Sequence, residues 1–192
     1  MRLSRSALEA RVKKFDVRLA NYADIPAIQE LMAASMASIL PRYLDENQVN
    51  LSSESMGVDA LLIEDGTYYL VFEADVLVGC GGWSARRTLY GNSQTIGRDD
   101  SYADHKTEPA KIRAMYTHPD YLRKGIGRLL LKTGEERARA AGFTVMELGA
   151  TAPGLPFYEA LGYCMIEDVS RASADGTVVP VLKMRKSLIG DA

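Results

Sequence analysis

The sequence of 192 residues has few cysteines, little net charge and no long apolar run, and each shortage excludes a class of protein. Its two cysteines, Cys80 and Cys164, are too few for a disulfide framework, and because both lie in apolar runs we expect buried free thiols. Neither forms a Cys-x-x-Cys pair or has a neighbouring histidine, so no metal site is predicted. The formal net charge of −2 argues against nucleic-acid binding. No apolar run approaches the roughly 20 residues that a membrane span needs.

The remaining composition is typical of a globular protein. The hydrophobic content is 47% and the charged content is 25%. A chain of this length can build one complete core, so we expect a single domain over residues 1–192. Residues 1–15 are charged and lack the apolar segment of a signal peptide, which predicts a cytoplasmic protein with a short N-terminal extension. Within the extension, Ser6 and Glu9 have capping-box spacing and predict a short helix through Lys14.

The most informative stretch lies between an expected strand, residues 111–117, and an expected helix, residues 127–141. It contains two glycines and three basic residues, which are Gly125, Gly127, Arg123, Lys124 and Arg128. Glycine lets the main chain approach a ligand closely, and the first turn of a helix offers free N–H groups and a partial positive charge. A strand, such a turn and a helix start therefore predict a site for phosphate or pyrophosphate.

This turn matches neither common nucleotide motif. The P-loop pattern is absent, and the dinucleotide fingerprint fails because position 130 is leucine. Residues 123–128 instead resemble the acetyl-coenzyme A signature of the GNAT superfamily of N-acetyltransferases, Arg/Gln-x-x-Gly-x-Gly/Ala. The preceding His-Pro-Asp-Tyr at 118–121 and the later Pro-Phe-Tyr-Glu-Ala-Leu-Gly-Tyr at 156–163 are also similar to that superfamily. The resemblance extends over about residues 17–185.

The GNAT resemblance implies an α/β (α+β) fold: a mixed, largely antiparallel seven-stranded sheet with helices on both faces and splayed central parallel strands. The residue patterns predict strands at 17–20, 67–73, 76–84, 111–117 and 143–150, then a hairpin of 163–171 and 178–185. Helices are expected at 25–40, 52–63, 127–141 and 155–161, the first capped by Asp24.

Two expected strands carry more detailed predictions. In residues 111–117, alternation places Ile112, Ala114 and Tyr116 on one face. Three glycines within residues 76–84 predict that a ligand or a packed aromatic side chain approaches that strand closely.

The resemblance also implies which residues bind acetyl-CoA. The main chain of Met115, Tyr116 and Thr117 would contact the acetyl-pantetheine arm. The pyrophosphate would lie on the turn, formed by Arg123, Lys124, Gly125, Ile126, Gly127 and Arg128. The N–H of Met115 would stabilise the developing oxyanion. Tyr158 matches the tyrosine that hydrogen-bonds the coenzyme sulfur, and its phenol, with a reference pKa of about 10, is suited to protonate the leaving thiolate.

The sequence leaves the general base and the acceptor open. Glu147, Glu108, His118 or a water relay could accept the proton from the amine. The polar segment 85–108 is either a solvated loop or a substrate-recognition loop. Residues 152–154 read Ala-Pro-Gly where many GNAT proteins carry a coenzyme-binding asparagine, which puts one pantetheine contact in doubt.

The leading functional hypothesis is an acyltransferase, specifically a GNAT-type N-acetyltransferase. It would move an acetyl group from acetyl-CoA to a primary amine of a small molecule or peptide by direct attack in a ternary complex. The alternatives are a non-catalytic acyl-CoA-binding sensor module and a transferase that uses another acyl-CoA. Tyr158 favours catalysis over binding alone. Because many GNAT relatives form dimers, the resemblance also implies a homodimer.

Overall fold

The structure is a computed structural model that describes residues 15–95 and 97–189. Within these residues, seven strands form one sheet in the order β1-β2-β3-β4-β5-β9-β6, and β7 and β8 form a separate pair. Only β4 and β5 run parallel among the paired strands of the sheet. The strands are β1 Asp16–Leu19, β2 Tyr68–Glu73, β3 Val76–Ser84, β4 Ala110–Thr117, β5 Val145–Thr151, β6 Cys164–Asp168, β7 Arg171–Ala172, β8 Val178–Val179 and β9 Val181–Ser187. The predicted mixed, largely antiparallel sheet is confirmed.

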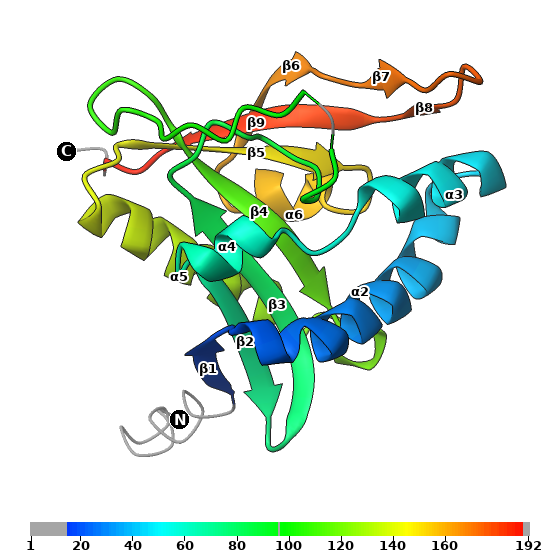
Figure 1. The fold of residues 1–192 in the computed structure, drawn as a ribbon, viewed down its shortest axis with the longest axis horizontal. Helices are drawn as coiled ribbons and strands as arrows, with labels where there is room; N and C mark the ends of the chain where they lie inside the picture. The colour runs from blue at the N-terminus through cyan, green and yellow to red at the C-terminus, as the bar shows by residue number, and fades with distance from the viewer. Residues whose placement is uncertain (1–14, 96, 190–192) are drawn as a thin grey trace, which may run out of the picture.

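Helices cover both faces of the sheet, as predicted. Figure 1 shows α2, α3 and α4 on the face turned towards the viewer. The helices are α2 Ile25–Ile39, α3 Glu46–Ser55, α4 Ala60–Glu64, α5 Ile126–Ala140 and α6 Leu155–Glu159, with 3-10 turns η1 Tyr22–Asp24, η2 Leu40–Arg42 and η3 Pro119–Tyr121. One core joins the sheet to α2 and α4, and a second joins it to α5. None of the helices in the described part of the chain is long and apolar enough to cross a membrane.

The start of α2 differs from its predicted capping. The helix begins with Pro26 in its first turn and buries Ile28, Leu31 and Met32, as the apolar spacing predicts. The carboxylate of Asp24 makes no cap to α2 and instead accepts hydrogen bonds from Arg18 at 2.6 and 2.8 Å. Asp24 is therefore the N-cap residue of α2, as predicted, but its side chain does not cap the helix, because a bidentate guanidinium binds both of its oxygens.

The predicted helix over residues 52–63 is two helices. Residues 56–59 are extended or irregular between α3 and α4. Asp59 starts the second helix, and its side chain accepts a hydrogen bond from the N–H of Leu61 at 3.2 Å. Asp59 is thus the N-cap of α4, whereas α3 already ends at Ser55. The apolar spacing alone did not reveal the break.

Of the two cysteines predicted to be buried, one is exposed. Cys80 is buried within the core on the α2 side, as predicted. Cys164 is exposed, so the prediction for it is wrong. Its strand, β6, is the last in the sheet order and all five of its residues are exposed. The apolar run around Cys164 therefore belongs to an edge strand rather than to the interior. The predicted helix in residues 6–14 lies outside the described residues.

Strand β4 contains a bulge that breaks the predicted alternation. Gly82 pairs with Arg113 and Cys80 pairs with Tyr116, so Gly81 alone faces both Ala114 and Met115. Ala114 has a φ of 51°, in the left-handed region. Ile112 consequently joins the core beside α5, whereas Tyr116 joins the core beside α2. The prediction that these two side chains share one face is wrong, because one extra residue shifts the alternation.

The central parallel strands diverge as predicted. The pairing of β4 with β5 is confined to Ala110 with Met146 and Lys111 with Glu147. On its other side, β5 pairs with β9 from Val145 to Thr151. Residues 112–117 of β4 therefore continue beside β3 without a β5 partner. This divergence places an open strand edge next to the turn that follows β4.

Candidate functional site

The turn between β4 and α5 contains two residues with positive φ. Arg123 has a φ of 63°, and Gly125, the residue before α5, has a φ of 92°. Leu129 donates its N–H to the Gly125 carbonyl at 3.0 Å, so the helical hydrogen bonding starts there. The first N–H groups of a helix have no carbonyl four residues earlier within it. The turn therefore presents free donors and the positive end of the α5 dipole.

The predicted turn residues divide between the surface and the core. Arg123, Lys124 and Arg128 are exposed. The Lys124 ammonium lies 4.0 Å from the centre of the Tyr121 ring, a cation–π contact. The side chain of Ile126 is 1% exposed within the core, so only its main chain faces the turn.

Gly127 lies against α6. A Cβ at this position would lie 3.1 Å from the Phe157 ring. A glycine here lets the first turn of α5 approach α6, the helix that carries Tyr158.

Main-chain groups of β4 point into the gap left by β5. The N–H of His118 donates to the Val78 carbonyl in β3 at 2.9 Å. The C=O and N–H of one trans peptide point in opposite directions, so the Thr117 carbonyl points away from β3. In an antiparallel pair, alternate residues direct their N–H and C=O groups towards the partner strand. Tyr116, two residues before His118 and opposite Cys80, therefore directs its main-chain groups towards β3. Of the three predicted contact residues, Met115 and Thr117 thus have carbonyls that point away from β3.

Tyr158 lies on α6, close to this gap. Its side chain is 9% exposed and makes edge-to-face contacts with Phe157 and Tyr163 at centroid distances of 5.1 and 5.9 Å. Burial raises the pKa of Tyr158 to about 12, so the phenol stays protonated at neutral pH. Burial also raises the pKa of Tyr116, with smaller contributions from Cys80 and Tyr158.

Glu147, one candidate base, is held in a buried ion-pair cluster. Its oxygens lie 2.6 Å from Arg185, 3.1 Å from Lys111 and 3.8 Å from Lys183. Burial alone would raise the pKa of Glu147, but the hydrogen bond from Arg185 and the charge of Lys111 outweigh it, and the pKa lies below the ordinary value. A carboxylate with this many cationic partners is a weak proton acceptor.

The other two candidate bases are also engaged. Glu108 pairs with Arg87 at 2.6 Å, and this hydrogen bond lowers the pKa of Glu108 to about 2. The Nδ1 of His118 accepts a hydrogen bond from the N–H of Asp120 at 3.3 Å. Both candidate carboxylates are therefore ion-paired, whereas His118 has a hydrogen bond at one of its two ring nitrogens.

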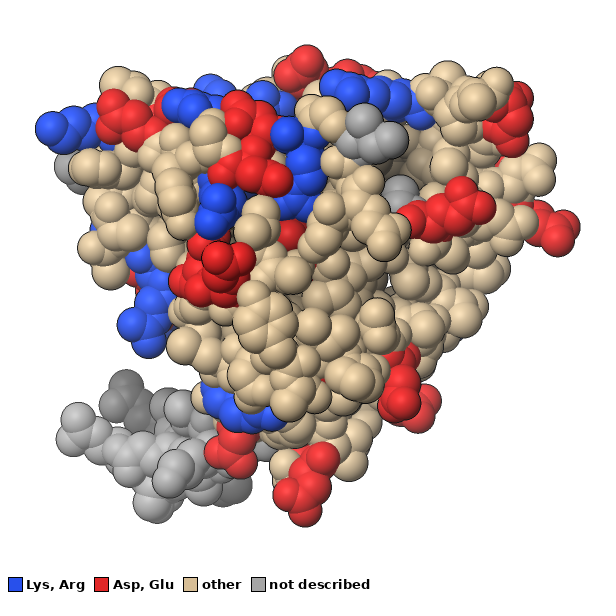
Figure 2. All heavy atoms as spheres, in the orientation of Figure 1, with Lys and Arg blue, Asp and Glu red and all other residues tan. Residues whose placement is uncertain are grey.

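The segment 85–108 is a loop, as predicted, and ion pairs attach it to the body of the protein. Asp59, with a side chain 1% exposed, accepts from both Arg98 and Arg113 at 2.8 Å. Arg86 makes two hydrogen bonds of 2.7 Å to Asp65. On the face of the molecule shown in Figure 2, acidic and basic side chains lie next to one another at the top, above a largely uncharged area. Sequence reasoning missed this network because its partners lie 21 to 54 residues apart.

Close neighbours leave no room for a side chain at the three glycines of β3. A methyl group on Gly79 would collide with Ile126, one on Gly81 with Met115, and one on Gly82 with the Thr67 carbonyl. The predicted close approach to this strand is confirmed, but the side chains that pack on Gly79 and Gly81 are Ile126 and Met115 rather than an aromatic residue. These contacts fix how closely α5 and the β4 bulge approach β3.

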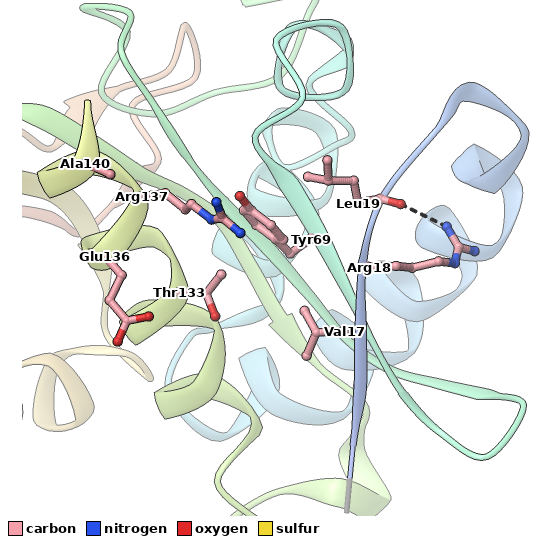
Figure 3. A pocket seen from close by; sticks show the side chains of 8 residues that line it. All are labelled: Val17, Arg18, Leu19, Tyr69, Thr133, Glu136, Arg137 and Ala140. Carbon is pink, nitrogen blue, oxygen red and sulfur yellow. Dashed lines mark hydrogen bonds between the residues drawn. The ribbon is translucent and has the colours of Figure 1, made fainter. Parts of the chain in front are cut away.

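A cavity of about 560 Å³ lies elsewhere, between β1, β2 and the second half of α5. Figure 3 shows Tyr69 and Arg137 approaching each other across it. Its lining residues include none of the predicted coenzyme-binding residues. Within the described residues, no group of three or more His, Cys, Asp or Glu side chains could hold a metal ion.

Comparisons with known proteins find similarity to GNAT acetyltransferases. The family model described as the Acetyltransferase (GNAT) family matches residues 27–163. The chain is similar to the GCN5-related N-acetyltransferase from Rhodopseudomonas palustris, with a TM-score of 0.67 and 17% identity over 90% of this chain and 94% of that one. No curated protein matches the sequence significantly.

Two further solved structures resemble the chain. The PaiA N-acetyltransferase from Thermoplasma acidophilum, in complex with coenzyme A, has a TM-score of 0.63 and 16% identity over 90% of this chain and 98% of that one. The ribosomal-protein-S18-alanine N-acetyltransferase from Escherichia coli has a TM-score of 0.57 and 14% identity over 93% and 96%. At these identities the likeness shows a shared fold.

Proposed function

The chain belongs to the GNAT acetyltransferase family, and on this basis we propose that it transfers an acetyl group from acetyl-CoA to a primary amine of a small molecule or peptide. The observation that carries the proposal is the divergence of β4 and β5 after Lys111 and Glu147. It leaves main-chain groups of residues 115 and 117 beside a turn suited to anions. An amide-rich ligand with a diphosphate matches both features.

The main chain of β4 provides the first part of the fit. Polar main-chain groups left unsatisfied away from water cost about 1–3 kcal/mol each. The amides of a pantetheine arm would satisfy the carbonyls of Met115 and Thr117 as an added strand would. The PaiA N-acetyltransferase has a similar fold and its structure contains coenzyme A, which supports coenzyme A as the ligand.

The turn provides the second part. The diphosphate would lie over the N–H groups of residues 124–128, where the α5 dipole favours negative charge. Arg123, Lys124 and Arg128 are exposed at the rim and would add charge-assisted contacts. The side chain of Ile126 would anchor the turn in the core rather than touch the ligand.

The residues around the gap support direct transfer. As the amine nitrogen bonds to the acetyl carbon and the carbon–sulfur bond breaks, the N–H of Met115 would stabilise the negative charge on the carbonyl oxygen. The phenol of Tyr158 would donate its proton to the leaving sulfur and recover one from solvent. Because Glu147 and Glu108 are ion-paired, we assign the proton from the amine to water.

Release of free thiol from acetyl-CoA, measured with a panel of amines and amino-terminal peptides, tests this proposal. We expect release that depends on both acetyl-CoA and one class of amine. Succinyl-CoA and propionyl-CoA in parallel reactions identify the donor. Tight coenzyme binding with no thiol release on any acceptor would instead support a non-catalytic acyl-CoA-binding module.

A further inference from the structure

Ala114 adopts a conformation that needs support. Its φ of 51° lies in the left-handed region, which glycine enters freely and alanine at a cost. It is one of two residues that share a single partner, Gly81, at the β4 bulge. Strained backbone of this kind persists only when the surroundings fix it. The residue that follows, Met115, carries the N–H that the proposed function assigns to the oxyanion.

The support comes from the phenol of Tyr68 on β2. This side chain is 1% exposed, within the core beside α2. Its Oη lies 3.0 Å from the Ala114 carbonyl and 3.2 Å from Cys80 Sγ. A carbonyl can only accept, so the single phenol proton is donated to Ala114. Burial raises the pKa of Cys80 to about 12, so the neutral thiol can donate in turn to the Tyr68 oxygen.

This hydrogen bond sets the direction of the next N–H. The Ala114 carbonyl and the Met115 N–H belong to one trans peptide and point in opposite directions. With the carbonyl held towards the Tyr68 side of the sheet, the N–H points away from that core. On the other face, the Met115 side chain packs over Gly81, where a methyl group would collide with it. Tyr68 and Gly81 thus hold the peptide from both sides.

We propose that Tyr68 is a positioning residue for catalysis: its hydrogen bond to the Ala114 carbonyl holds the β4 bulge so that the Met115 N–H faces the reacting carbonyl. The inference rests on the proposed function and assigns a role to a residue that would not touch either substrate. No proton passes through Tyr68 during the reaction. The amine–carbon bond forms and the carbon–sulfur bond breaks at the gap, with Tyr158 supplying the proton to sulfur.

Tyr68→Phe removes only the hydroxyl, and it has a matched control. Tyr69→Phe makes the same change one residue along β2, where the side chain lies on the opposite face, in the core beside α5 (Figure 3). We expect Tyr68→Phe to lower kcat at least tenfold with the KM for acetyl-CoA changed less than about threefold, because a misdirected oxyanion donor affects the transition state selectively. Tyr69→Phe should stay within about twofold of wild type in both.

A second variant separates positioning from core packing. Ala114→Gly removes the cost of positive φ, so the bulge no longer depends on Tyr68. Adding Ala114→Gly to Tyr68→Phe should recover at least fivefold of the lost kcat. A crystal structure of Tyr68→Phe should show the peptide between residues 114 and 115 reoriented.

Three results would overturn the inference: unchanged kcat in Tyr68→Phe, a loss that Ala114→Gly does not relieve, or a Tyr68→Phe structure that keeps φ of Ala114 near 51°. If wild-type protein transfers acetyl to no amine, the proposed function fails. The orientation of the peptide in the Tyr68→Phe crystal then still decides whether Tyr68 holds the bulge.

Discussion

Among single residues, Tyr158 bears most directly on the proposed chemistry. Its phenol is buried, and its pKa of about 12 keeps it protonated across the working pH range. Tyr158→Phe should lower kcat about a hundredfold, the usual contribution of a general acid, and leave the coenzyme Kd within about threefold. The deficit should be equal at pH 7.5 and pH 9.5, because the phenol ionises in neither condition. Steady-state kinetics and calorimetric titration with CoA measure the two effects.

A neighbouring tyrosine provides the control. Tyr163 packs against Tyr158 and donates to the buried Glu135 at 3.0 Å. Tyr163→Phe should lower thermal stability while kcat stays near the wild-type value. If Tyr163→Phe lost as much kcat as Tyr158→Phe, packing rather than proton donation would explain the role of the aromatic pair.

Residues within contiguous motifs could be predicted, and residues defined by distant partners could not. Gly125 and Tyr158 could be proposed as site residues because the turn and the α6 segment each occupy a short stretch of sequence. Glu147 looked like a candidate base because its partner Arg185 is 38 residues away. An ion pair across strands leaves no local signal in the sequence.

At the scale of elements, the turn before α5 depends on one backbone angle. A Cβ on Gly125 would meet nothing within 4 Å, so its φ of 92°, rather than space, requires glycine. Gly125→Val should therefore shift the turn and weaken coenzyme binding at least tenfold, since the N–H groups lose their common direction. Calorimetric titration with CoA provides the measurement.

Gly176 offers a matched comparison at a distance from the turn. It has a φ of 86° with open space around it, in the turn between β7 and β8. Gly176→Val imposes the same backbone strain, so it should lower stability similarly and leave the CoA Kd unchanged. Equal losses of affinity in the two variants would show that general destabilisation, not the turn, controls binding.

The loop 85–108 is a second element whose stability can be tested. Asp59→Ala would leave the buried guanidinium groups of Arg98 and Arg113 without their shared carboxylate. Breaking a buried pair in this way costs about 3–5 kcal/mol, which urea unfolding can measure. The exposed Asp99 is the control, and Asp99→Ala should cost less than about 1 kcal/mol. A small effect of Asp59→Ala would mean that the network does not hold the loop.

The elements were predictable to different degrees. Strands β2 and β3 and helix α5 followed from hydrophobic spacing and turn residues. The bulge at Ala114 did not, because residues 111–117 alternate regularly in sequence and only the pairing with β3 reveals the extra residue. The break at 56–59 was missed because apolar residues continue through it at helical spacing.

For the whole molecule, the buried Glu147 cluster joins β4, β5 and β9 and makes stability depend on pH. The folded pKa of Glu147 is lowered, so its contribution is complete above the unfolded value of about 4.3 and is lost as pH falls through the folded value. Glu147→Gln should therefore be less stable than wild type at pH 7, and the difference should shrink below pH 4. Urea unfolding across this range measures the difference.

Glu167 serves as the control for this pH dependence. Its side chain is 59% exposed and lies 3.7 Å from Lys183, so Glu167→Gln should follow the wild-type curve. A constant difference between Glu147→Gln and wild type from pH 7 to pH 3 would show that Glu147 does not stabilise the sheet through its charge.

The central claim is that acetyl-CoA binds between the diverging strands β4 and β5, with its diphosphate on the turn before α5. A crystal structure of the protein with bound acetyl-CoA tests it most directly. We predict pantetheine amides bonded to the main chain of residues 115 and 117, phosphates over residues 124–128 and the sulfur beside the Tyr158 hydroxyl. A coenzyme bound elsewhere, with the gap between the strands filled by protein side chains, would contradict it.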